Sequence, residues 1–151
     1  MRIVVAILLL LSFIFAEQIE ITSQKFEGDQ KRLLSIFTGN VFMKKGKDII
    51  KAQKVTIYFD KKRKPQKIIA IGKVNFTLYD KNGKYYKGNC DKAIYYPKKK
   101  EYHLFGNVAV MQLPDNKKLY SQKLVLNLLT SHVVVEGKGK KPVKMIFEIK
   151  E

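Results

Sequence analysis

The sequence is poor in the residues that build disulfides, metal centres and nucleophilic active sites. Its 151 residues include one cysteine, two histidines and no tryptophan. Cys90 alone cannot form an internal disulfide, and no cysteine–histidine cluster is available for a structural zinc ion. His103 and His132 have no serine or cysteine nucleophile near them in sequence, and the acidic residues are scattered without a carboxylate pair. We therefore expect no enzyme, no metal site and no cofactor.

The N-terminus has the organisation of a secretory signal peptide. A basic start at Arg2 precedes a hydrophobic run over residues 3–15, which is followed by Ala16-Glu17. The run is shorter than the roughly 20 residues that cross a bilayer as a helix. Ile14 is larger than the small residue usual at its position before the cleavage site, so an uncleaved membrane anchor is the alternative. We predict a signal peptide over 1–16 and a single domain over 17–151.

Beyond residue 22 the sequence has the period-two alternation of β-strands and no long amphipathic helix. Val143, Met145, Phe147 and Ile149 alternate with mostly polar residues, and similar patterns cover 55–59, 74–78 and 124–128. Turn residues separate these runs, with Asp80–Gly83 as a hairpin turn in which Asn-Gly tolerates positive φ angles. The pattern predicts an all-β domain with no substantial helix after the signal peptide.

An internal repeat divides the domain into units of similar length. Gly39, Gly72 and Gly106 follow one another at spacings of 33 and 34 residues, and Gly137 comes after a further 31. The second element of each unit reads small–polar–Lys–apolar, at residues 52–55, 90–93 and 121–124. One unit cannot bury its apolar face alone, so stacked units must share a continuous core. A glycine at the same point of each unit indicates a bulge or corner. When the second elements are aligned, Cys90 takes the position of Ala52 and Ser121, so we predict that it is a small residue whose side chain faces inward.

These motifs in this order resemble the OstA-like family of lipopolysaccharide transport proteins, most closely its LptA members. The resemblance covers about residues 19–149 and includes the phrase from Phe37 to Val41 and the closing Glu136 to Gly139. It implies an open, twisted β-jellyroll of stacked antiparallel strands with an apolar interior. It also implies a periplasmic location, binding of lipid A acyl chains, head-to-tail self-association, and LptC-like and LptD-like jellyroll domains as partners that bridge the two membranes.

Apolar residues at alternating or repeat-equivalent positions are the candidates for a lipid-binding interior. They are Val41, Met43, Val55, Ile57, Phe59, Val74, Phe76, Leu78, Tyr95, Val108, Val110, Leu124, Leu126 and Leu128. Each could equally be ordinary core. In an open fold, however, part of this face lacks a protein partner, and acyl chains would supply the contacts at about 0.8 kcal/mol per buried CH₂.

The first and last strands are candidates for association between copies. Their alternating apolar residues are Ile19, Ile21, Val143, Met145, Phe147 and Ile149. Terminal strands of an open fold leave backbone groups unpaired, and such edges accept a strand from another chain. Edge pairing between different surfaces does not close on itself and builds filaments.

The net charge of +17 leaves open what the basic residues bind. Most lysines lie in the turns, where they are either simply solvated or attract lipid phosphates and membrane surfaces. A secreted polyanion-binding β-protein is therefore an alternative, as is an LptC-like membrane-anchored scaffold. Only three of the 30 basic residues are arginine and no basic recognition helix is present, so we expect no nucleic acid partner.

Overall fold

The computed structural model describes residues 18–149 and confirms the predicted all-β fold. The predicted signal peptide lies outside the described residues. Across residues 18–149 no helix is long and apolar enough to cross a membrane. The strands are β1 (Ile19–Thr22), β2 (Lys25–Asp29), β3 (Leu34–Lys45), β4 (Asp48–Phe59), β5 (Pro65–Tyr79), β6 (Tyr85–Tyr96), β7 (Glu101–Leu113), β8 (Lys117–Asn127), β9 (His132–Glu136) and β10 (Lys144–Ile146).

All strands belong to one antiparallel sheet whose six long strands follow chain order from β3 to β8. At each end of the sheet, two short strands take the place of one long strand. β3 pairs with β2 through its first half and with β1 through its second half, and β8 pairs with β10 and then with β9. The sheet therefore begins at β1 and β2 and ends at β9 and β10.

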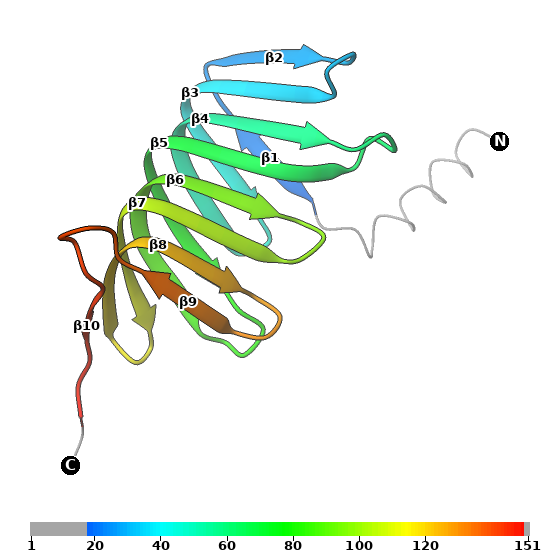
Figure 1. Cartoon of the computed structure of the whole chain (residues 1–151). Helices are drawn as coiled ribbons and strands as arrows, with labels where there is room; N and C mark the ends of the chain where they lie inside the picture. Colours follow the sequence, from blue (N-terminus) through cyan, green and yellow to red (C-terminus); the bar gives the residue numbers. More distant parts are fainter. Residues whose placement is uncertain (1–17, 150–151) are drawn as a thin grey trace.

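Each long strand bends once, so the sheet folds into two layers that share one corner (Figure 1). The first, the β2–β9 layer, contains residues 25–29, 34–38, 54–59, 65–71, 92–96, 101–105, 123–127 and 132–136. The second, the β1–β10 layer, contains residues 19–22, 41–45, 48–52, 74–79, 85–90, 108–113, 117–121 and 144–146. This is the predicted open, twisted β-jellyroll.

The corner is a row of bulges at the repeated glycines. The register shifts between Thr38 and Val41, and equivalent shifts occur where β5 and β7 bend. Gly39, Gly72 and Gly106 have φ angles of 89°, 89° and 77°, and the residue after each is also left-handed. Glycine adopts this conformation at no steric cost, whereas a Cβ would be strained. The prediction of a bulge at these three glycines is confirmed.

Gly137, the fourth glycine of the series, does not form such a bulge. It follows β9 in the connection to β10, and it is not among the glycines with positive φ. A Cβ there would instead meet the backbone of Lys141 and Pro142. Gly137 therefore lies where the chain crosses from one layer to the other at the end of the sheet. The two short strands β9 and β10 there replace one long bent strand.

The last predicted strand is much shorter than its sequence pattern. Alternation extends from Val143 to Ile149, yet only Lys144–Ile146 pairs, against three residues at the start of β8. Residues beyond 146 continue past the sheet and remain exposed. The prediction of a seven-residue strand was wrong because β8 begins at Lys117, one residue before the last paired position, and offers almost no further partner backbone.

Two runs close to the corner, residues 68–71 and 104–105, are apolar at every position, and their side chains alternate between the inner and the outer face of the sheet. Ile68, Ala70 and Leu104 face the space between the layers and are buried, whereas Ile71 and Phe105 face outward. Cross-strand pairing aligns the inward residues of neighbouring strands in rows. The core consequently lies between the two layers and runs along the whole jellyroll.

The close packing at the corner predicts that G72A lowers the free energy of unfolding by a large amount. A Cβ at Gly72 would lie 3.0 Å from the Cβ of Gln53, and its φ is 89°. The left-handed φ costs an L-residue about 1–2 kcal/mol, and overlap in a packed site adds about 1–3 kcal/mol, so we expect unfolding free energy to fall by about 3 kcal/mol. The measurement is urea denaturation followed by circular dichroism.

G83A is the matched control. Gly83 has a φ of 83°, but no atom lies within 4 Å of the position that a Cβ would take, so only the backbone cost of about 1–2 kcal/mol applies. Equal losses for G72A and G83A would contradict the tight packing of the corner.

Candidate lipid-binding interior

Every residue predicted for the lipid-binding interior lies between the two layers. All of them belong to the core cluster, with Phe59 as a partly buried neighbour. Val55, Val74 and Leu78 have no exposed surface at all. The structure thus brings the predicted set together on the inner faces, and their contact with lipid stays a prediction.

Several interior residues were not anticipated from the sequence. They are Ile50, Ile68, Ala70, Tyr86, Ala93, Tyr102 and Leu104. Tyr102 and Leu104 alternate with outward residues on β7, so the period-two pattern could have identified them. The buried Asp48 and Asp80 carried no such signal, because aspartate beside a turn is usually solvated.

Gly88 shows how closely the interior is packed at its centre. It pairs with Phe76 and Val110 in an inward-facing row. A Cβ on Gly88 would meet the Ala109 carbonyl oxygen and would lie 2.9 Å from the Phe76 ring. The missing side chain therefore leaves the space that the Phe76 ring occupies.

A cavity of about 110 Å³ opens between the layers near β9 and β10. Its walls are apolar residues of both layers, including Phe76, Leu104 and Leu126. Val133 of β9 and Met145 of β10 line it and are 36% and 54% exposed, because the sheet ends there. Lys117 and Lys118 also line this cavity. It therefore combines an apolar wall with nearby positive charge.

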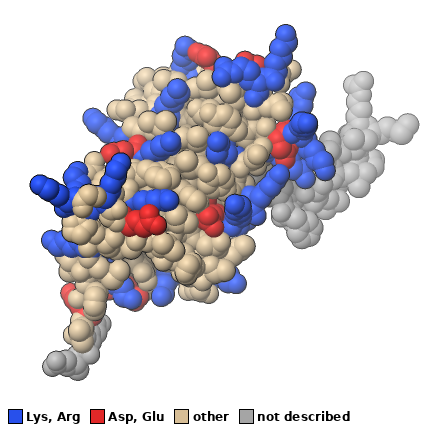
Figure 2. Space-filling view, viewed as in Figure 1, with Lys and Arg blue, Asp and Glu red and all other residues tan. Residues whose placement is uncertain are grey.

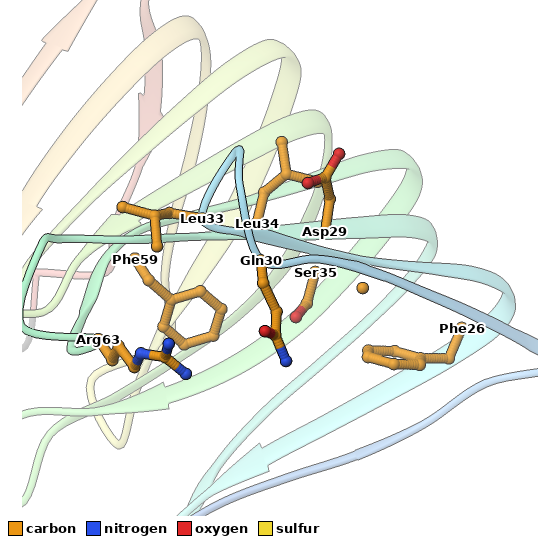
Figure 3. Close-up of a pocket in the computed structure, with 9 residues that line it drawn as sticks. Phe26, Asp29, Gln30, Leu33, Leu34, Ser35, Phe59 and Arg63 are labelled. Atoms are coloured by element: carbon orange, nitrogen blue, oxygen red, sulfur yellow. The ribbon is translucent and has the colours of Figure 1, made fainter.

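A second pocket, of about 490 Å³, lies at the opposite end beside β2 (Figure 3). The rings of Phe26 and Phe59 and the side chain of Leu33 line it together with Arg63. Phe26 is 59% exposed, and its ring contacts that of Phe37 at a centroid distance of 5.1 Å. Both ends of the interior thus expose apolar side chains next to a cation.

On the face shown in Figure 2, lysines and arginines are spread out rather than gathered in one patch. Several lie against outward-facing rings: Lys92 and Lys123 each stand 5.9 Å from the Phe105 ring centre, and Lys67 stands 4.8 Å from that of Tyr58. Such cation–π contacts stabilise exposed sites by about 0.5–1 kcal/mol. The outer lysines therefore have a structural use.

The Cys90 side chain is directed into the interior at the corner. It is buried, as are the repeat-equivalent Ala52 and Ser121. Burial raises the pKa of the Cys90 thiol to about 12, so the thiolate is scarce at neutral pH. The placement confirms Cys90 as a small inward residue.

His103 faces outward on β7, 2.7 Å from the Glu101 carboxylate, and its ring packs edge-on against Tyr96. The His103 hydrogen bond lowers the pKa of Glu101. Within residues 18–149 no three histidine, cysteine or acidic side chains are placed to hold a metal ion.

The predicted edge residues differ in exposure between the two ends. Ile19 and Ile21 of β1 are partly buried and pack against the core. Val143, Met145, Phe147 and Ile149 are exposed at the other end. Among the strands of residues 18–149, β1 and β2 each pair with β3 alone, while β9 and β10 each pair with β8 alone. Both ends therefore present strand edges, and the predicted apolar edge residues are exposed at the last one.

The fold and its interior define an open β-jellyroll that encloses an apolar space between two layers. A family model described as the LptA/(LptD N-terminal domain) LPS transport protein matches residues 20–132. The chain therefore belongs to this family of lipopolysaccharide transport proteins, which confirms its resemblance to the OstA-like group that includes LptA.

A solved structure agrees with this assignment at the level of the fold. It is the crystal structure of LptH, the LptA-homologous periplasmic component of the lipopolysaccharide transport device of Pseudomonas aeruginosa. The two chains superpose with a TM-score of 0.78 at 15% sequence identity, over 88% of this chain and 96% of that chain. Comparison with curated protein sequences gives no match.

Proposed function

We propose that this protein is a periplasmic carrier that holds the acyl chains of lipopolysaccharide between its two layers and passes the lipid between membrane components. It acts without catalysis, as a binding surface whose directionality is supplied by other proteins. Family membership supports lipopolysaccharide as the cargo. The apolar interior supports the acyl chains as the part that is shielded.

The cavity near β9 and β10 is the observation that carries this proposal. Apolar walls from both layers suit a hydrocarbon chain, which gains about 0.8 kcal/mol for each buried CH₂. Lys117 and Lys118 stand where an anionic group attached to that chain would lie. Lipid A joins acyl chains to phosphates, so one cavity can recognise both parts.

The pocket beside β2 repeats this combination at the other end. Phe26, Leu33 and Phe59 supply the apolar surface, and Arg63 supplies the cation. A lipid handed along the jellyroll would meet similar chemistry at the two openings. A polyanion binder would need neither opening to be apolar, so this observation favours the carrier over that alternative.

The V133D variant tests the cavity without disturbing the core. Val133 lines the cavity but is already 36% exposed, so an aspartate there can remain solvated while the protein stays folded. We expect its carboxylate to repel lipid phosphate and to wet the cavity mouth, which weakens lipopolysaccharide binding at least tenfold, or about 1.4 kcal/mol. Equilibrium binding of fluorescent lipopolysaccharide measures this change.

V134D is the control from the next position on the same strand. Val134 pairs with Val125 on the outer face and is 43% exposed, so the two variants carry the same charge at similar exposure. V134D should bind like the unmodified protein. Equal binding by V133D and V134D would contradict binding of the lipid in this cavity.

We also propose that copies associate head to tail, with the β9 and β10 end of one protein against the β1 and β2 end of the next. Exposed apolar residues at 143–149 and the exposed Phe26 at the other end support this arrangement. The same edges would receive LptC-like and LptD-like jellyroll domains. Stacked in this way, the interiors would form one continuous apolar path between the membranes.

Two end-blocked variants distinguish this arrangement from symmetric dimers. One variant ends at Pro142 and lacks the exposed tail, and the other carries Phe26→Asp at the opposite end. Each variant alone should be monomeric in sedimentation velocity, while a 1:1 mixture should form dimers through the two intact ends. Dimerisation of either variant by itself would contradict head-to-tail contact.

A further inference from the structure

A line of polar contacts joins the two layers at the edge opposite the glycine corner. The Lys45 ammonium donates a hydrogen bond to the Tyr95 hydroxyl at 2.9 Å, and the Tyr102 hydroxyl donates to Asp48 at 3.4 Å. Further along, the Ser131 hydroxyl donates to Asp80 at 3.0 Å. These contacts, with Asn82 Nδ2 donating to Ser131 Oγ at 3.1 Å, are here named the clasp.

Each aspartate of the clasp reaches the opposite layer with one of its two oxygens. Asp48 Oδ1 accepts the Tyr79 backbone N–H of its own layer, and Asp48 Oδ2 accepts the hydroxyl of Tyr102 across the gap. Asp80 Oδ1 likewise accepts two backbone N–H groups of its own turn, while Oδ2 accepts the hydroxyl of Ser131 across the gap and that of Tyr86 in its own layer. Bonds within the layer therefore fix each carboxylate, and Oδ2 also joins it to the opposite layer.

The two aspartates of the clasp are buried although they are polar, whereas Lys45 and Ser131 are partly buried and Asn82 is exposed. Asp48 and Asp80 are each 7% exposed, and the rings of the clasp residues Tyr95 and Tyr102 stack at a centroid distance of 4.4 Å. Apolar side chains at this edge would keep the layers together, because their separation exposes hydrocarbon to water. A hydrogen-bonded edge differs, since water can satisfy both halves when they part.

The two long edges of the jellyroll therefore have opposite mechanical properties. At the corner, every long strand continues from one layer into the other, so the layers cannot separate there. At the clasp, none of the strands from β3 to β8 crosses between the layers, and in the part of the chain that the structure describes side chains join the layers across this edge. The arrangement allows the layers to hinge about the corner and open at the clasp.

We infer that the clasp is the lateral entrance through which the lipid loads, an inference that rests on the proposed carrier function. The centre of the interior is filled by the protein's own side chains, so acyl chains need space that opening creates. A lipid with a bulky headgroup enters sideways more easily than lengthwise, because the headgroup stays in water. Lys45 stands at this edge and meets the headgroup's phosphates.

A removable staple across the clasp tests this inference. The variant N82C/S131C, in a Cys90→Ala background that copies the repeat-equivalent Ala52, is joined by a bis-methanethiosulfonate with an ethylene spacer. Dithiothreitol removes the staple from the same sample. We expect the stapled protein to load fluorescent lipopolysaccharide at least tenfold more slowly than the same protein after the staple has been removed.

D60C/K98C is the matched control, stapled in the same way. The Lys98 ammonium lies 3.1 Å from the Asp60 carboxylate, and both belong to turns of the β2–β9 layer, so this staple joins no second layer. It should leave loading unchanged. Equal loading rates for the stapled and reduced N82C/S131C protein would overturn the lateral entrance. Absence of binding by the reduced and unmodified proteins would instead overturn the carrier function itself.

Discussion

The row of left-handed glycines at the corner is the constraint on which the rest of the structure depends. Three long strands must bend at Gly39, Gly72 and Gly106, and the side chains of Gln24, Gln53 and Asp91 pack over these bends. Without the bends the sheet would be a single layer with one apolar face in water. With them, the same face closes on itself, and a continuous core forms without a second sheet.

In this construction the backbone of the long strands joins the two layers along one edge, the corner. The β2–β9 and β1–β10 layers share backbone at the corner, apolar packing in the middle and polar side chains at the clasp. The sheet also stops at both ends, where Phe26, Val133 and Met145 remain exposed. An interior of this kind can take up hydrocarbon at its open ends or when its layers part, whereas a closed sandwich offers neither route.

Alternation and repeats predicted an all-β domain and most of its interior, because inward positions of a strand are fixed by its period of two, whereas the jellyroll itself was implied by the family resemblance. Phe76 and Leu78 were placed correctly for this reason, and Gly72 was identified as a bend by its spacing from Gly39. The clasp was not predictable in the same way. Asp48 and Tyr102 are 54 residues apart, and only the meeting of two layers brings them together. The length of β10 was not predictable from its own alternation either, because it is set by the residue at which its partner strand β8 begins.

The central claim is that the apolar interior, not the lysine surface, binds the lipid. The most direct measurement compares binding of residues 17–151 to intact and to deacylated lipopolysaccharide, at low and at high salt. Surface charge interactions are screened within about 3 Å at 1 M salt, while buried apolar contacts are not. The account predicts binding that requires the acyl chains and persists at high salt. Binding that ignores the acyl chains and disappears at high salt would contradict it.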